Sequence, residues 1–343
     1  MEKIDFVIPW VDGDDPSWCS EKQKWEAISK NEMSAANDAN SACRYRSDSE
    51  LLRYWFRGVE KNASWVNKIH FVTCGQKPVW LNENHPKLNL VNHEDFIPHR
   101  YLPTFNVNPI EMNFHRIEEL SEQFVYFNDD IFLLRPVAPD FFFRDDDPVL
   151  DTTLRYTDLV EYSNWSRLVF NDYCLVNKSF NIGKSIWENR KKWFNLSELG
   201  YKRARRNFVC YLANKTLPVN LYGHVALPHL KSTLREVWER HYEVMDQTCI
   251  HKFRSDDQVN QWLLCAWNQA KGRFFPAHEK NLGVNASISL EALNWICEII
   301  KSQSAPQICV NDGLFNTDPI RCGNEIEKAF YSILPNRSTF EIS

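Results

Sequence analysis

Acidic side chains stand in turns that follow short apolar runs, where they could bind a metal ion or a phosphate group. The acidic residues in or near such turns are Asp12, Asp14, Asp15, Glu111, Asp129, Asp130 and Asp312. Carboxylate oxygens are hard ligands that suit Mg²⁺ or Mn²⁺, and these ions suit the diphosphate of a nucleotide sugar. A pair of aspartates alone is weak support, because such a turn also commonly begins a helix. The YFNDD sequence at residues 126–130 indicates a metal site more strongly, since it ends an apolar run with adjacent aspartates.

Histidine and basic side chains gather in a later part of the sequence. His224 and His229 lie close together, and His251, Lys252 and Arg254 follow them. An arginine fork matches phosphate oxygens, and a histidine can transfer a proton near neutral pH. A single histidine is more often structural than catalytic. The residues alone therefore leave both interpretations open for this pair.

The elements that must position these residues begin with four apolar runs rich in strand-forming residues. The predicted strands are Ile4–Trp10, Val66–Cys74, Leu88–Val91 and Phe124–Phe127. Helical spacing of apolar residues predicts helices after Ser47 and over Pro109–Leu120. Strands that alternate with helices indicate a three-layer α/β fold. Ligands in such folds bind beyond the carboxyl ends of the strands, which is where the acidic turns fall.

The middle of the chain changes character. Residues 159–216 are predicted to form a helical insertion between two parts of one α/β catalytic core, residues 1–158 and 217–343. From Lys184 to Arg206 there are eight basic residues against two acidic ones. A solvated helix face is the ordinary explanation. The functional alternative is contact with an anionic glycan, a lipid-linked acceptor or an anionic membrane surface.

The last part of the sequence returns to mixed strands and helices. The pattern predicts a loop that carries His224 and His229. The other predicted elements are a strand at Pro218–Tyr222, helices at Leu234–Tyr242 and Asp256–Ala270, a strand at Gln307–Val310 and a helix at Asn324–Leu334.

Composition limits the function classes. The 343 residues are 43% hydrophobic and 25% charged, which is typical of a folded globular protein. The net charge of −5 does not favour nucleic acid as a partner. The ten cysteines lack zinc-finger spacing, so we expect reduced thiols. No run approaches the roughly 18–20 apolar residues of a membrane span, and no secretory signal is recognisable, so we expect a soluble protein made in the cytosol.

Taken together, the motifs resemble the four conserved blocks of the Stealth proteins. IDFVIPWVDGDDPSW resembles the first block, and residues 46–136, with WVNKIHFVTCGQKPVWLN, LPTFNVNPIE and HRIEELSEQFVYFNDDIF, resemble the second. YGHVALPHLKSTLREVWERH, continued by HKFRSDDQVNQWL, resembles the third. CVNDGL and FYSILPNRSTFE resemble the fourth. The helical middle is the least matched part.

The resemblance implies an activity. Stealth proteins include bacterial capsular and cell-surface polysaccharide phosphotransferases and the eukaryotic GlcNAc-1-phosphotransferase. It implies transfer of a hexose-1-phosphate or N-acetylhexosamine-1-phosphate from a UDP-sugar to a hydroxyl of an oligosaccharide or lipid-linked glycan. The products would be a phosphodiester and UMP, in bacterial capsule or cell-surface polysaccharide biosynthesis. It also implies a Rossmann-like core related to the GT-A glycosyltransferases.

The resemblance also assigns roles to residues. Glu111, Asp130 and Arg254 match acidic and arginine positions of the family's active site. The sequence GHVALPHL departs from the family's usual H-x-P spacing, so the family histidine corresponds to either His224 or His229. His224 is slightly favoured, and His229 is kept. The remaining expected roles are substrate binding by Asp12, Arg254 and Asp257, and Mg²⁺ or Mn²⁺ binding by Asp129, Asp130 and Asp312.

Two other functions fit the residues without the resemblance. An ordinary GT-A glycosyltransferase would attack the anomeric carbon and release UDP. A non-catalytic glycan-binding subunit would use its tryptophans and its basic face. We expect a cytoplasmic enzyme that could also bind peripherally to the inner face of the membrane through Lys184–Arg206.

Overall fold

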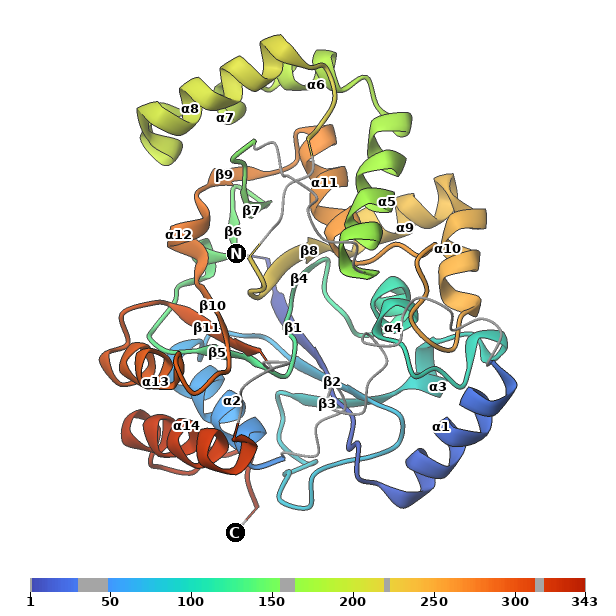
Figure 1. Ribbon diagram of the computed structural model, residues 1–343, viewed down its shortest axis with the longest axis vertical. Helices are drawn as coiled ribbons and strands as arrows, with labels where there is room; N and C mark the ends of the chain where they lie inside the picture. Colours follow the sequence, from blue (N-terminus) through green and yellow to red (C-terminus); the bar gives the residue numbers. More distant parts are fainter. Residues whose placement is uncertain (1, 30–48, 155–163, 219–222, 312–317, 343) are drawn as a thin grey trace.

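A mostly parallel sheet forms the centre of the computed structural model, which describes residues 2–29, 49–154, 164–218, 223–311 and 318–342 (Figure 1). Its strands, in spatial order, are β3 (Leu88–Asn92), β2 (Ile69–Thr73), β1 (Ile4–Pro9), β4 (Gln123–Tyr126) and β8 (Leu227–Leu230). The first four are parallel, and β8 runs antiparallel to β4. The register places Phe6 beside Ile69 on one side and Val125 on the other. The four strands predicted in the first part of the chain are therefore confirmed.

Apolar residues on both faces of β1 explain why this strand lies inside the molecule. Phe6 and Ile8 point to one hydrophobic cluster, and Val7 points to the other. The first cluster includes residues of α2 (Ser49–Asn62), α13 (Leu293–Ser302) and α14 (Pro319–Ile333). The second includes residues of α4 (Val107–Asn113), α9 (Lys231–Arg240), α10 (Tyr242–Ile250) and α11 (Trp262–Lys271). Helices thus cover both faces, and the fold is a three-layer, Rossmann-like α/β core.

Two smaller sheets extend this core. One consists of β10 (Val284–Ser287), β11 (Gln307–Asn311) and β5 (Ile131–Leu133), and the other of β6 (Phe143–Arg144), β7 (Asp147–Asp151) and β9 (Phe275–Ala277). A tight turn after β4 leads the chain directly into β5. The backbone N–H of Val310 donates to the carbonyl of Asp130 at 2.8 Å, which fixes that turn against β11.

The middle of the chain is helical, as predicted. It forms α5 (Asn164–Ser179), α6 (Ile182–Glu188), α7 (Arg190–Trp193) and α8 (Leu196–Ala213), with a break at Gly200 (φ 72°). In Figure 1, α6, α7 and α8 lie at the upper end of the molecule, and α5 descends from them. α5 packs against α11 of the core. The division into a core and an insertion at residues 159 and 216 remains a prediction.

Some local predictions differ from the structure. The helix predicted to reach Leu120 ends at Asn113 and is followed by a 3₁₀ turn, Phe114–Arg116. The helix predicted from Asp256 begins at Trp262 instead. The strand predicted at Pro218–Tyr222 lies mostly outside the described residues. The remaining elements are α1 (Pro16–Ile28), α3 (His93–Phe96), α12 (Glu279–Leu282) and the 3₁₀ turns His99–Tyr101 and Pro139–Phe141.

Candidate functional site

The chain order of the strands creates a crevice between β1 and β4. After β1 the chain crosses to β2 and β3 on one side, and it later returns to β4 on the other. The connections that leave β1 and β4 therefore diverge, which is where open α/β sheets bind ligands. A cavity of about 150 Å³ lies at this point. Its lining includes Trp10 after β1, Tyr126 at the end of β4, and the charged residues Asp129 and Arg254.

The Asn128-Asp129-Asp130 turn directs its two carboxylates to different places. Asp129 lines the cavity. Asp130 is 8% exposed and faces β11 of the β10-β11-β5 sheet. One of its carboxylate oxygens, Oδ2, lies 4.0 Å from Nδ1 of His224. Its other oxygen, Oδ1, is buried and has no hydrogen-bond partner among the described residues. The two adjacent aspartates thus face two different places, Asp129 the cavity and Asp130 the ring of His224.

Asp130, His224 and Cys309 form a compact group. Their ligand atoms all lie within 4.8 Å of one another. The Cys309 Sγ atom is 3.4 Å from Nδ1 of His224, and the Asn128 amide nitrogen is 2.5 Å from Nε2 of the same ring. This group could hold a metal ion. Cys309 was not predicted as a ligand, because a cysteine inside a strand, far from the other ligands in sequence, gives no spacing signal.

Glu111 is buried and does not line the cavity, although the residue before it, Ile110, does. α4, which carries it, is capped by Asn106, whose side chain accepts a hydrogen bond from the N–H of Asn108. Glu111 is 5% exposed and accepts a hydrogen bond from the N–H of Gln261 at 3.1 Å. Burial raises its pKa to about 7, although this hydrogen bond and the positive charge of Arg254 oppose the rise. A carboxyl with that pKa can act as a general base near neutral pH.

The loop that carries Arg254 is fixed to the beginning of α4. The Asn106 side chain donates to the carbonyl of Phe253 at 3.1 Å. Gln258 is fully buried, and its side-chain oxygen accepts from Asn106 at 3.1 Å, from Asn108 at 2.8 Å and from the N–H of Ser255 at 3.1 Å. Arg254 is therefore held from both sides by backbone contacts. Gln258 was not predicted from the sequence to belong to the site.

A second buried acid, Asp172 of α5, approaches the same turn. It is fully buried, and Oδ1 accepts from the N–H of Asn260 at 3.1 Å, one residue before the amide that serves Glu111. Its Oδ2 has no partner among the described residues. Burial, with a smaller effect from the charge of Glu111, raises the pKa of Asp172 well above its ordinary value. The only sequence signal was a single aspartate among the apolar residues of α5.

Other predicted site residues lie away from the cavity wall. The backbone of Asp12 exchanges hydrogen bonds with the Gln76 side chain, and its carboxylate accepts from the N–H of Asp14. Asp257 is exposed and lies 3.2 Å from His251. His229 is buried within β8, not in a loop, and burial lowers its pKa to about 4. Asp312 lies outside the described residues.

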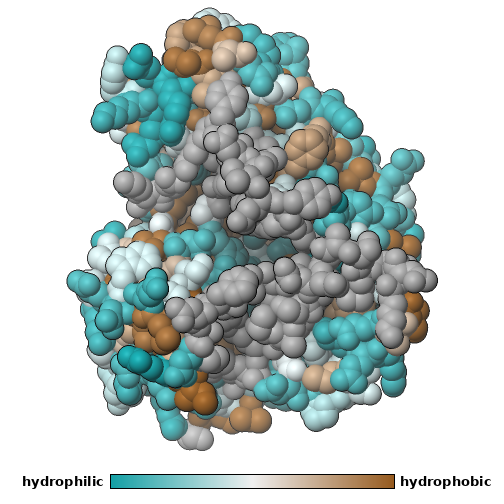
Figure 2. All heavy atoms as spheres, in the orientation of Figure 1, coloured by the Kyte–Doolittle hydropathy of each residue, from teal (hydrophilic) through white to brown (hydrophobic). Residues whose placement is uncertain are grey.

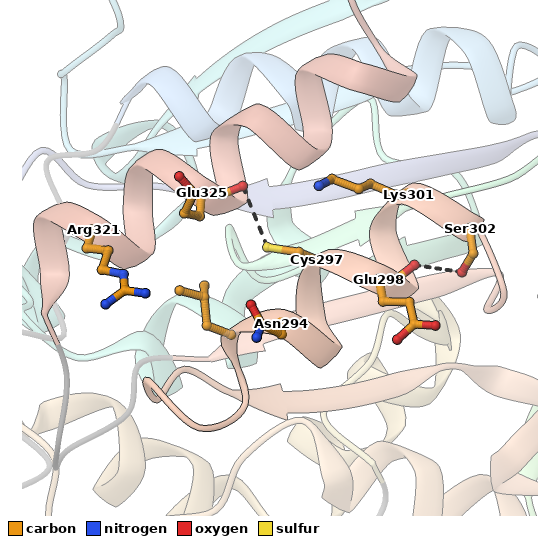
Figure 3. Close-up of a pocket in the computed structure, with 8 residues that line it drawn as sticks. Asn294, Cys297, Glu298, Lys301, Ser302, Arg321 and Glu325 are labelled. Carbon is orange, nitrogen blue, oxygen red and sulfur yellow. Dashed lines mark hydrogen bonds between the residues drawn. The ribbon is translucent and has the colours of Figure 1, made fainter.

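A larger hollow, of about 780 Å³, lies between α13 and α14 (Figure 3). Figure 3 shows Glu325 and Arg321 on one helix and Asn294, Cys297 and Lys301 on the other. None of the predicted site residues lines it. Because it also lies away from the carboxyl ends of β1 and β4, we assign it no part in the site.

The fold and the crevice define a Rossmann-like α/β protein with a candidate ligand site at the carboxyl ends of its parallel strands. Comparison with known proteins gives the family. Residues 2–30 match Stealth protein CR1, conserved region 1, and residues 44–150 match Stealth protein CR2, conserved region 2. The chain belongs to the Stealth family, and it is a phosphotransferase.

Full-length relatives support this assignment. The chain is 38% identical to the capsular polysaccharide phosphotransferase WcwK of Streptococcus pneumoniae, over 99% of each protein. It is also 38% identical to the receptor polysaccharide phosphotransferase WefC of Streptococcus oralis, over 100% of each. The capsular polysaccharide phosphotransferase CpsJ of Streptococcus thermophilus is 44% identical over 60% of this chain and 84% of its own length.

Proposed function

We propose that this enzyme transfers a hexose-1-phosphate or N-acetylhexosamine-1-phosphate from a UDP-sugar to a glycan hydroxyl during bacterial capsule or cell-surface polysaccharide biosynthesis. The acceptor oxygen attacks the sugar-bearing β-phosphorus and forms a new P–O bond. The bond from that phosphorus to the bridging oxygen of the pyrophosphate breaks, and UMP leaves with this oxygen. The sugar keeps its anomeric C–O bond. The supporting observation is the crevice between β1 and β4, with Asp129, Arg254 and Glu111, in a chain similar to named polysaccharide phosphotransferases.

The cavity wall suits a nucleotide. Trp10, Trp18 and Phe105 give it an aromatic side against which a uracil ring can pack. Phe105 stacks on Phe253 with ring centroids 5.4 Å apart, so this side is held beside the Arg254 loop. A donor whose base lies on the aromatic side would have its phosphates near Arg254.

Within this site, each residue receives a role. Phosphoryl transfer depends mainly on positioning and on neutralising charge. Arg254 would bind the non-bridging oxygens where charge develops. Glu111 or His224 would take the proton of the acceptor hydroxyl. His229 is the weaker candidate, because it is buried within β8 and burial lowers its pKa to about 4. Its Nε2 atom lies 3.1 Å from the side-chain oxygen of Gln261. Asp12 and Asp257 remain proposals for substrate contacts outside the cavity wall.

The acids near the cavity also fit a divalent cation. Asp130 has a buried oxygen without a partner among the described residues, and Asp129 lines the adjacent cavity. These two residues, together with Asp312, would hold Mg²⁺ or Mn²⁺. When bound, the ion would neutralise the diphosphate charge and favour departure of UMP.

Product analysis tests the reaction. The purified chain is incubated with a panel of UDP-sugars, Mg²⁺ and acceptor oligosaccharides, and mass spectrometry measures what is added to the acceptor. We expect addition of a hexose-phosphate with release of UMP. Addition of a bare hexose with release of UDP would overturn the proposal and favour a GT-A glycosyltransferase. The second alternative, a non-catalytic glycan-binding subunit, is not retained because the chain is a phosphotransferase.

We also propose that α8 contacts an anionic membrane surface that carries a lipid-linked glycan acceptor. No helix in the described parts of the chain is long and apolar enough to span a membrane. Tyr201, Phe208 and Leu212 are 71%, 43% and 60% exposed, and their spacing places them along one side of α8. Exposed Arg205 lies within this stripe, and exposed Arg206 lies beside it. Figure 2 shows hydrophobic and hydrophilic side chains side by side at this upper end of the molecule.

A further inference from the structure

We infer that Asp130, His224 and Cys309 form a binding site for Zn²⁺ or a similar thiophilic divalent metal ion, distinct in ligand chemistry from a Mg²⁺ site. The three ligand atoms come from the turn after β4, from the segment before β8 and from β11. They lie within 4.8 Å of one another, although the residues are far apart in the sequence. A cation at their centre would bind all three with small side-chain shifts.

The donor set selects the metal. Zn²⁺ takes thiolate, imidazole and carboxylate ligands together, commonly in tetrahedral sites. Mg²⁺ prefers six oxygen ligands and keeps several waters, so it would gain little from sulfur and nitrogen. Three protein ligands leave a fourth position of a tetrahedral zinc ion for water or an anion. The three ligands therefore match a zinc site in which the protein leaves one coordination position open.

Two buried polar atoms near the group lack partners. Oδ1 of Asp130 and Oδ1 of Asn128 make no hydrogen bond among the described residues. The carboxylate faces His224 through Oδ2, at 4.0 Å from Nδ1, and a cation bound to this carboxylate could also be reached by Oδ1. Buried polar atoms are rarely left unpaired in native proteins, so the unpaired oxygen of Asp130 points to a missing ligand.

Asn128 can orient the histidine for metal binding. Its amide nitrogen now lies 2.5 Å from Nε2 of His224. A half-turn of this amide would place Oδ1 there, as the acceptor of an Nε2–H bond. Nδ1 would then keep its lone pair, directed toward Cys309 at 3.4 Å and Asp130 at 4.0 Å. Metal-bound histidines usually donate their second N–H to such a partner.

Occupation by zinc would compete with turnover. Asp130 is the residue proposed to share Mg²⁺ with Asp129, and His224 is one of the two proposed bases. Zinc would engage both side chains at once. Zn²⁺ is therefore expected to inhibit the Mg²⁺-dependent reaction, and a chelator that prefers zinc is expected to restore it.

The metal-binding test needs no substrate, so it is independent of the proposed reaction. The full chain is stripped with a chelator, dialysed and titrated with ZnCl₂ by calorimetry, and CoCl₂ is added separately as a spectroscopic probe. We expect one Zn²⁺ per chain and a thiolate-to-cobalt charge-transfer band. The band should disappear in Cys309→Ser and persist in Cys174→Ser, a matched change at a half-buried cysteine of α5.

A second variant covers the case in which the buried Cys309 change impairs folding. His224 is partly exposed, so His224→Gln should fold, as circular dichroism can check. We expect its zinc affinity to fall by more than the roughly 10–100-fold that loss of an outer partner such as Asn128 costs. Wild-type chain that binds no zinc, or His224→Gln that binds it as tightly as wild type, would overturn the inference.

Discussion

At the scale of single residues, the site depends on acids whose surroundings separate their roles. Asp129 faces a cavity, Asp130 faces a histidine and a cysteine, and Glu111 is buried beside one backbone amide. Burial disfavours the charged form of a carboxyl, and nearby N–H groups and cations favour it. The balance at Glu111 leaves its pKa at about 7, where a base is most useful in the cell.

Replacing Glu111 tests its role as the base. Glu111→Gln keeps the shape and the acceptor for Gln261 but cannot take a proton. We expect kcat to fall by about 10²–10⁴-fold. In the wild type, kcat should rise with pH through about 7 as Glu111 loses its proton, and this limb should vanish in the variant. If the variant keeps both the rate and the limb, His224 becomes the preferred base, and His224→Gln is the parallel measurement.

Asp172 allows a prediction about stability. Its folded pKa is raised, so above the ordinary value of 3.8 the unfolded chain loses this proton while the folded chain keeps it. The free energy of unfolding therefore falls progressively as the pH rises from 3.8 toward the raised pKa of the folded state. Asp172→Asn retains an acceptor for Asn260 and removes the ionisation. We expect a free energy of unfolding that falls less steeply with pH than in the wild type.

Urea unfolding at several pH values measures this difference. The matched control is Asp140→Asn at an exposed position, which should keep the wild-type pH dependence. An unchanged slope in Asp172→Asn would contradict the prediction.

At the scale of elements, the site depends on the contact between α4 and the loop before α11. Asn106 caps α4, and its side chain also donates to the carbonyl of Phe253. The side-chain oxygen of Gln258 in turn accepts from Asn108 of α4. The two sides of Arg254 are thus fixed by a helix that lies about 150 residues earlier in the chain. The position of the guanidinium group follows from these amide contacts.

Gln258→Leu should release this loop. It removes the acceptor of three donors, and each buried donor left unpaired costs about 1–3 kcal/mol. We expect a lower free energy of unfolding and a loss of kcat/KM, because Arg254 no longer meets the phosphates. Gln247→Leu, on the exposed side of the same region, is the control. Wild-type kcat/KM in a stably folded Gln258→Leu would show that Arg254 does not need this support.

An element was predicted correctly where its own residues determine it, and incorrectly where contacts with distant residues do. β1 and β4 were predictable because both faces are buried, and this requires apolar runs. The turn at Asp129 and Asp130 was predictable for the same reason. The start of α11 was not, since residues 256–261 follow a helical pattern. Their backbone amides instead serve Asp172 and Glu111, which lie far away in the sequence.

The grouping of Asp130, His224 and Cys309 could not be predicted from the sequence either. His224 and Cys309 meet Asp130 only because β5 and β11 pair and β8 joins the central sheet. Single-sequence patterns do not report such long-range contacts. The resemblance of the motifs to a family supplied Glu111, Asp130 and Arg254, and the structure brings Arg254 close enough to affect Glu111 electrostatically.

At the scale of the whole molecule, charge and exposed apolar surface are unevenly distributed. The chain has a net charge of −5, yet Lys184–Arg206 contains eight basic residues against two acidic ones. The exposed apolar side of α8 lies within the same upper end of the molecule (Figure 1). This combination is typical of helices that lie in a membrane interface.

Vesicle binding tests this arrangement. Each basic residue near an anionic surface contributes about 1 kcal/mol, so the double change Arg205→Gln and Arg206→Gln should weaken binding to phosphatidylglycerol vesicles about 30-fold. Sedimentation with vesicles measures the change. Arg321→Gln with Lys328→Gln, on α14, is the matched control and should bind as wild type. Equal binding by the α8 double variant would contradict a membrane role for this helix.

The turn at residues 260 and 261 has a consequence for recombination among related genes. Its successive amides bind an acid from α5 and an acid from α4, so three distant stretches must suit one another. A crossover that takes α5 from one parent gene and this turn from another would combine an acid and a turn that had diverged separately. The hydrogen bond between them would then no longer be matched. Functional hybrids should therefore inherit all three stretches from a single ancestor, whereas the outer helices could be exchanged more freely.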